Sequence, residues 1–216
     1  MNPDLLNFSA AIFDLDGTLA DSNTVWEKLD RLILDKYGVS ADDAFITELA
    51  AMTYCEAAEA MRKKGIPISE EDFTEQINAL AKIEYANNIM LKPYAEELLR
   101  NMKNTGMKII LATASPKELY EPLLCRFDVY QLFDGFITTD DIGKSKEFPD
   151  IYLKAAKIAG FPISECIIFE DTITAIKTAS KTGAFVCAVY DKYSDQNADE
   201  IKNMSDKYVY SFEELL

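Results

Sequence analysis

Residues 10–18 read Ala-Ala-Ile-Phe-Asp-Leu-Asp-Gly-Thr, so an apolar stretch runs directly into two aspartates. The apolar residues predict a buried strand that ends at the edge of a sheet. Because side chains alternate along a strand, we expect Asp14 and Asp16 to point into one pocket. Two carboxylates in one pocket repel each other unless a cation lies between them or one of them holds a proton. The pattern favours a site for a hard divalent metal over the alternative, a simple Asp-Gly turn.

After Thr18 the chain shows only helical patterns for about 70 residues. Helix-start signals, a Ser or Thr followed three residues later by an acid, occur at Thr24, Ser40 and Ser69. Glycines and a proline separate the helical stretches. These signals predict about four helices in residues 19–90, forming a small domain inserted behind the first strand.

From Pro93 onward, predicted strands alternate with predicted helices. The strands are expected at 108–112, 135–138, 166–169, 185–189 and 207–210, and the helices at 94–103, from 115, 149–159 and 174–182. Such alternation predicts an α/β fold with a doubly wound, Rossmann-like parallel sheet. The core would comprise residues 1–18 and 91–216, and sheets of this kind bind ligands at the carboxyl ends of their strands.

Polar residues follow several of these strands. The hydroxyl of Thr113 and the backbone N–H of Ala114 come where a strand meets a helix, a position suited to holding a phosphate oxygen. Lys146 lies in a polar loop and would place a point charge against a phosphoryl group. Most such threonines and lysines have only a structural role, so each signal is weak alone. Glu170 and Asp171 end another strand, facing the first acidic pair as oxygen ligands of the sort that Mg²⁺ takes.

The net charge and the absence of histidine exclude several classes of function. Thirty-seven acidic and 22 basic residues give a formal charge of −15, which repels nucleic acid and anionic membranes, so we expect neither as a partner. The chain has no histidine, which excludes a Ser-His-Asp triad, a Cys-His pair and every His-ligated metal site. Acid–base chemistry must therefore fall to Asp, Glu, Lys, Tyr or Cys.

The cysteines indicate the compartment. Cys55, Cys125, Cys166 and Cys187 are scattered and form no Cys-x-x-Cys pair, a pattern typical of reduced residues. The N-terminus does not resemble a signal peptide, and no apolar run reaches about 18 residues. We therefore expect a cytoplasmic protein without a membrane-spanning segment.

Together these residues resemble the haloacid dehalogenase-like hydrolase superfamily, in its phosphatase and β-phosphoglucomutase-like branch. The family's motifs occur in order: Asp-x-Asp-Gly-Thr at 14–18, a threonine at 113, a lysine at 146 and paired acids at 170–171. The resemblance covers essentially the whole chain. It implies that residues 19–90 are the helical cap domain of that branch.

The resemblance also implies an activity, a magnesium-dependent phosphatase acting on a small phosphorylated metabolite. Asp14 would attack phosphorus to give an aspartyl phosphate, and Asp16 would act as general acid and then general base. Mg²⁺ would be held by Asp14, the backbone carbonyl of Asp16, and Asp171. Glu170 would be either an outer-shell ligand or a positioning residue. The phosphoryl oxygens would be stabilised by Thr113, Ala114 and Lys146.

The chain departs from the family pattern in several places. Glu147 replaces the first proline of the lysine loop, which leaves Lys144 as a weaker candidate than Lys146. Residues 172–175 replace the usual Ser-x-x-Gly behind the paired acids. Trp26 stands in the region where β-phosphoglucomutase-like members have a cap histidine, and residues 51–56 lack the glycine and arginine common in their cap loop. These departures weaken the assignment as a mutase.

Other functions remain open from the sequence. A sugar phosphomutase would use the same aspartyl phosphate and return the phosphoryl group to the sugar. A receiver-like signalling module also has acidic strand ends, but it is only about 120 residues long and has no helical insert. The substrate and the oligomeric state are not determined by the sequence. Trp26, Thr53 and Tyr54 are either cap residues that face the site or ordinary packing residues.

Overall fold

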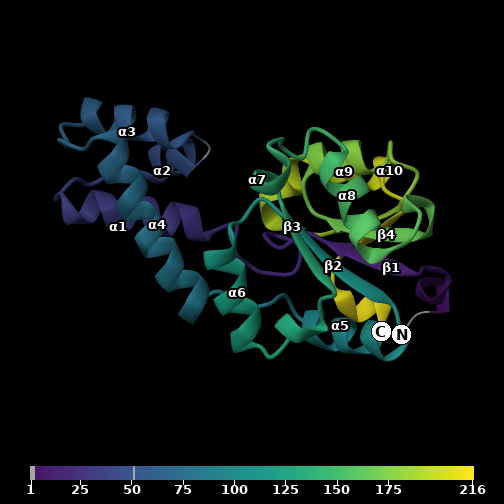
Figure 1. The fold of residues 1–216 in the computed structure, drawn as a ribbon. Coiled ribbons are helices and arrows are strands. Elements are labelled where there is room, and N and C mark those ends of the chain that lie inside the picture. Colours follow the sequence, from purple (N-terminus) through teal and green to yellow (C-terminus); the bar gives the residue numbers. More distant parts are fainter. Residues whose placement is uncertain (1–2, 51) are drawn as a thin grey trace. The chain divides into compact units, whose positions relative to one another are not determined.

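The computed structural model describes residues 3–50 and 52–216 (Figure 1). Ala51, the first residue of the 51–56 loop discussed above, and residues 1 and 2 lie outside this range. The chain divides into two compact units. The core unit consists of Met1–Asp21 and Met90–Leu216, and the helical unit consists of Ser22–Ile89.

The core unit is built on a parallel sheet, which confirms the predicted fold class. Within the described residues the sheet has six strands, in the order β3-β2-β1-β4-β5-β6. They are β1 (Ala10–Phe13), β2 (Lys108–Thr113), β3 (Gly135–Thr138), β4 (Cys166–Glu170), β5 (Phe185–Val189) and β6 (Lys207–Val209). Every neighbouring pair runs parallel. The first strand of the chain is therefore central, at the point where the strand order reverses and where such sheets bind ligands.

Strand β1 is covered on both faces. All four of its residues are buried, which is why it reads as a continuous apolar run rather than an alternating one. Ile12 belongs to a core cluster formed with residues of α8, α9 and α10. On the other face, the ring of Phe13 stacks on Phe169 at 4.3 Å between centroids, and both rings contact Phe212. Packing on both faces makes the end of β1 a rigid support for the residues that follow it.

Helices and short 3-10 turns connect the strands of the core unit. The helices are α5 (Ala95–Asn104), α6 (Lys117–Arg126), α7 (Thr139–Ile142), α8 (Asp150–Ala159), α9 (Ile173–Ala179) and α10 (Ala198–Met204). The turns are Pro3–Asn7, Tyr130–Leu132, Ile163–Glu165, Lys192–Asn197 and Phe212–Leu215. The sequence patterns predict neither α7 nor α10, which are short. Among the described residues, none of the helices combines the length and apolarity needed to cross a membrane.

The start of α6 differs from the sequence-based prediction. The pattern Ser115-Pro116-x-Glu118 predicts a capping box, but the helix begins at Lys117 with Pro116 at the N-cap and no side-chain cap. The Ser115 hydroxyl donates instead to Asp16, at 2.6 Å. The predicted cap is wrong: the helix starts two residues later, and the Ser115 side chain is turned toward Asp16, 99 positions away, rather than toward the first turn of α6.

The helical unit contains four helices within the described residues, as the sequence predicts. They are α1 (Val25–Lys36), α2 (Asp43–Ala50), α3 (Tyr54–Lys63) and α4 (Glu70–Asn87). Of the three predicted start signals, only Ser69 acts as a side-chain cap, accepting from the backbone N–H of Asp72. Thr24 makes no cap bond, and Asp42 takes the place of Ser40 by accepting from Phe45 N–H. A capping box at Thr53 starts α3.

Candidate active site

The parallel sheet brings the predicted site residues to one edge. Asp14 follows β1, whose last residue pairs with Leu111 of β2 and with Phe169 of β4. The backbone N–H of Asp14 donates to the carbonyl of Phe169 at 3.0 Å, which fixes the direction of the chain as it leaves β1. Thr113 and Glu170, the last residues of β2 and β4, therefore lie on either side of it.

Three carboxylates form a buried cluster at this edge. Asp14, Glu170 and Asp171 each offer one oxygen, and these oxygens lie within 4.8 Å of one another. The residues are 8%, 1% and 0% exposed. Burial, opposed by Lys146 and reinforced by the neighbouring acids, raises the pKa of Asp14 well above its usual range. Simultaneous ionisation of all three carboxylates is therefore unfavourable in the absence of a cation. A bound cation would make it favourable.

Asp16 lies beside this cluster without being part of it. It is only partly buried, and its Oδ2 accepts the hydrogen bond from the Ser115 hydroxyl at 2.6 Å. A carboxylate that is held by a hydrogen bond and still reached by water is suited to exchanging protons. Asp14 and Asp16 thus occupy two different environments, although they are two residues apart.

Lys146 contacts two carboxylates of the cluster. Its Nζ lies 2.5 Å from Asp14 Oδ1 and 2.7 Å from Glu170 Oε1. Burial lowers its pKa, but the two carboxylates outweigh burial and raise the pKa above the usual value, so the lysine stays charged. The weaker candidate, Lys144, points elsewhere and pairs with Asp150 at 2.6 Å on the surface. The substitution of proline by Glu147 does not prevent Lys146 from reaching the cluster.

A second set of contacts surrounds Asp171. The Thr18 hydroxyl donates to its Oδ1 at 3.0 Å. Burial first, and then Glu170 and Asp191, raise the pKa of Asp171 to about 7, with Lys92 and the Thr18 bond acting in the opposite direction. Lys92 and Asp191 form an ion pair of 3.0 Å whose side chains are 12% and 7% exposed.

Glu170 has two partners. Besides Lys146, the hydroxyl of Tyr152 on α8 donates to the same Oε1 at 2.7 Å. This bond and the burial around it raise the pKa of Tyr152 well above its usual value, with burial the larger cause. Glu170 therefore orients Lys146 in this structure, whichever role it takes toward a metal.

Thr113 and Ala114 lie at the end of β2, just before α6 begins. Thr113 is fully buried, and its hydroxyl oxygen accepts the backbone N–H of Ser115 at 3.0 Å. A hydroxyl that accepts one bond can still donate its own hydrogen, here to a phosphoryl oxygen. Ala114 lies in the exposed bend between β2 and α6.

Five residues of the site were missed by the sequence analysis: Thr18, Lys92, Ser115, Tyr152 and Asp191. Asp191 comes two residues after β5, so the rule that drew attention to the other strand ends applies to it as well. Ser115 carried a signal that pointed to a helix cap. Tyr152 is a buried aromatic residue in a helix, and such residues are usually ordinary core.

The donor set fits a divalent cation. Asp14, Glu170 and Asp171 bring three carboxylates, and Lys146 contacts two of them, Asp14 and Glu170. All the donors are oxygen atoms, which suits a hard ion such as Mg²⁺ or Ca²⁺. The negative charge and the ligand chemistry of this cluster are therefore compatible with a bound divalent cation.

The sequence of motifs and this geometry agree with a comparison of the chain with known families. Residues 11–189 match the family described as haloacid dehalogenase-like hydrolase. The chain belongs to this family. Membership makes the protein an enzyme of the hydrolase type and confirms the resemblance drawn from the sequence motifs.

The chain is also similar to individual proteins and to solved structures. An uncharacterized protein of Schizosaccharomyces pombe, C4C5.01, is 30% identical over 206 residues, covering 86% of this chain and 82% of that protein. Validoxylamine A 7'-phosphate phosphatase of Streptomyces hygroscopicus subsp. limoneus is 27% identical over 182 residues, covering 82% of this chain and 84% of the relative. The crystal structure of CbbY from Rhodobacter sphaeroides in complex with phosphate has a TM-score of 0.78 at 23% identity, covering 96% of each chain. The last comparison supports the fold.

Proposed function

We propose that this protein is a magnesium-dependent phosphatase that hydrolyses a small organic phosphate monoester through an aspartyl phosphate on Asp14. The observation that carries the proposal is the contact of buried Asp14 with Lys146 inside a cluster of three carboxylates. The relative from Streptomyces, a phosphatase by name, supports the same reaction class. We also propose, from the sequence, that the substrate is a phosphorylated metabolite and that the protein is cytoplasmic. Neither nucleic acid nor a membrane is proposed as a partner.

In the proposed reaction Asp14 is the nucleophile and Asp16 is the general acid and base. A carboxylate oxygen of Asp14 attacks phosphorus, the bond to the leaving oxygen breaks, and that oxygen takes a proton from Asp16. In the second step, Asp16 takes a proton from a water molecule whose oxygen attacks the phosphorus and frees Asp14. The Ser115 hydroxyl, 2.6 Å from Asp16, holds the carboxyl in one orientation for both transfers.

The phosphoryl oxygens need positive partners. Lys146 supplies a charge beside Asp14, and the Thr113 hydroxyl and the Ala114 N–H supply hydrogen bonds at the start of α6. Such electrostatic stabilisation is the dominant contribution in phosphoryl transfer. Glu170 and Tyr152 keep Lys146 in position.

The residues that would hold Mg²⁺ are Asp14, Asp171 and the backbone carbonyl of Asp16, with Glu170 outside them or as a direct ligand. When bound, the ion cancels the repulsion between the Asp14 carboxylate and the anionic phosphate. Thr18 orients Asp171 toward this role by donating to its Oδ1.

We further propose that residues 19–90 act as the cap of the enzyme, controlling access of water and choice of substrate. The compact helical unit of residues 22–89 supports this proposal. The competing proposal is a sugar phosphomutase, which returns the phosphoryl group from Asp14 to a sugar. The absence of histidine favours the phosphatase, because the mutases that this chain resembles use a cap histidine.

The test is a panel of phosphorylated metabolites incubated with the full chain and Mg²⁺, scored for released inorganic phosphate. We expect steady release from at least one small ester and none from the Asp14→Asn variant, which keeps the shape and removes the attacking charge. Equal release by the variant would overturn the assignment of Asp14. Isomerisation of β-glucose 1-phosphate that outruns phosphate release would favour the mutase.

A further inference from the structure

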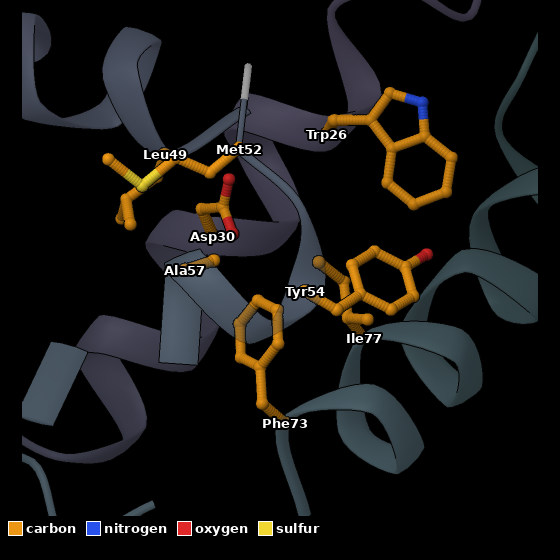
Figure 2. Close-up of a pocket in the computed structure, with 8 residues that line it drawn as sticks. All are labelled: Trp26, Asp30, Leu49, Met52, Tyr54, Ala57, Phe73 and Ile77. Carbon is orange, nitrogen blue, oxygen red and sulfur yellow. The ribbon is translucent and has the colours of Figure 1, made fainter. Parts of the chain in front are cut away.

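A pocket lies inside the helical unit, walled by residues of all four of its helices (Figure 2). Its volume is about 210 Å³. Three aromatic side chains contribute to the wall, namely Trp26 of α1, Tyr54 of α3 and Phe73 of α4, and the remaining lining is aliphatic apart from Asp30. A cavity of about 150 Å³ is large enough for a benzene ring, so this pocket accommodates a six-membered ring with a small substituent.

Asp30 is the charged residue in this apolar wall. Figure 2 shows its carboxyl group among the hydrophobic side chains. The residue is 2% exposed, and within the described part of the chain its Oδ1 has no hydrogen-bond partner. Leaving a buried carboxylate oxygen unpartnered costs free energy, and an apolar residue of similar volume would avoid that cost. The position is therefore poorly explained by stability of the helical unit alone.

The neighbours of Asp30 do not supply the missing partner. Glu27, one turn earlier on α1, is itself an acid, and Tyr54 on α3 has its hydroxyl 3.4 Å from Asn78 Oδ1. The residues of α2 and α4 in the wall, Leu49 among them, are apolar. Burial first, and then Glu27, raise the pKa of Asp30 to about 7, so near neutral pH the carboxyl ionises readily once a positive group approaches.

We propose that this pocket binds a compact organic ammonium ion, with Asp30 accepting its N–H and the aromatic walls holding its hydrocarbon part. The faces of Trp, Tyr and Phe rings attract a cation through their quadrupole, most strongly for Trp. In this pocket the carboxylate would pair with the charged head of an amine, and the three rings would pack against its apolar body. A neutral ligand of the same shape would leave Asp30 unpartnered.

The proposed binding does not rest on the proposed phosphatase activity, and its test uses no phosphate. Trp26 is the only tryptophan of the chain and lines the pocket, so intrinsic tryptophan fluorescence reports on the pocket directly. We would titrate the full chain with cyclohexylammonium at about pH 8, above the pKa of Asp30 and below that of the amine. The neutral isostere cyclohexanol serves as the matched probe.

A saturable fluorescence change is expected with cyclohexylammonium, with an affinity about tenfold or more above that for cyclohexanol, equivalent to about 1.4 kcal/mol. Asp30→Asn should weaken amine binding by a similar factor, whereas Glu27→Gln, the same charge change outside the pocket wall, should change it by about threefold at most. Equal affinity for both probes, or no saturable change with the amine, would overturn the proposal. The comparison of probes on the unmodified chain stands even if the Asp30 variant fails to fold.

Discussion

The Nζ atom of Lys146 lies 2.5 Å from Oδ1 of Asp14, although 132 positions separate the two residues in the sequence. The same Nζ is 2.7 Å from Oε1 of Glu170. One lysine therefore compensates part of the charge of two buried carboxylates, and a buried charge without a partner is strongly destabilising. Lys146 thus serves both the folded state and, in the proposed reaction, the incoming phosphoryl group.

Removing this lysine should therefore impair phosphate release. In Lys146→Met, kcat/KM for the best substrate should fall by about 10²–10³, because the transition state loses its charged partner. Lys144→Met is the matched control, since Lys144 pairs with Asp150 on the surface, and it should retain activity within about twofold. A larger loss from Lys144→Met than from Lys146→Met would reverse the assignment of the loop lysine.

The hydrogen bond from Ser115 to Asp16 predicts a dependence on the leaving group. In Ser115→Ala, Asp16 loses its orienting partner, so kcat/KM for an alkyl phosphate should drop by about tenfold. The value for p-nitrophenyl phosphate should change far less, because p-nitrophenolate departs without needing a proton. Parallel steady-state kinetics on the two esters provide the measurement. An equal loss with both would show that Ser115 supports the structure and not the proton transfer.

The carboxylate cluster predicts metal dependence. Chelation with EDTA should abolish phosphate release, and added Mg²⁺ should restore it. Calorimetric titration should show Mg²⁺ binding that is about tenfold or more weaker in Asp171→Asn, because the negative charge of one ligand is lost. The exposed Glu118→Gln variant removes a charge of the same sign and should bind normally. Full activity in chelator would contradict the metal assignment.

Asp30 predicts a pH dependence of stability. Its pKa is raised from 3.8 to about 7 in the folded chain, so the folded state binds the proton more tightly than the unfolded state. The stability associated with this group is therefore present below about pH 4 and is lost as the pH rises to about 7, with little change above. Compared with Asp30→Asn, the unmodified chain should lose about 2–4 kcal/mol of unfolding free energy over this interval.

Urea unfolding of the two proteins at several pH values measures this difference. Titrating groups that do not interact with Asp30 contribute equally to both chains, so the difference reports Asp30 together with its neighbour Glu27. Parallel pH profiles for the two proteins would show that Asp30 does not titrate in this range.

Much of the fold was predictable because parallel sheets leave a strong signature. The four buried residues of β1 read as a continuous apolar run, and the later strands alternate with helices. Since parallel strands present their carboxyl ends at one edge, the sequence also indicated that Asp14, Thr113 and Glu170 would gather there. These predictions depend only on strand order and direction.

The hydrogen-bond partners of the site residues and the pocket of the helical unit could not be predicted, because they depend on contacts between residues far apart in the sequence. Ser115 fits a helix cap by its spacing, but in the folded chain its hydroxyl is turned toward Asp16. Tyr152 looks like core, and only the folded structure brings its hydroxyl to Glu170. In the helical unit, Trp26 and Tyr54 were expected either to face a site or to pack, and they line a pocket with Asp30. An acid on the buried side of α1 was the available signal for that pocket.

The most direct test of the account is detection of the phosphoryl group on Asp14. The Asp16→Asn variant should react with p-nitrophenyl phosphate, whose leaving group needs no acid, and should then stall because no base activates water. Mass spectrometry of the acid-quenched, digested protein should find one phosphoryl group on the peptide that contains Asp14, and none after Asp14→Asn. A phosphoryl group on another residue, or rapid turnover by Asp16→Asn without any modified peptide, would contradict the proposed mechanism.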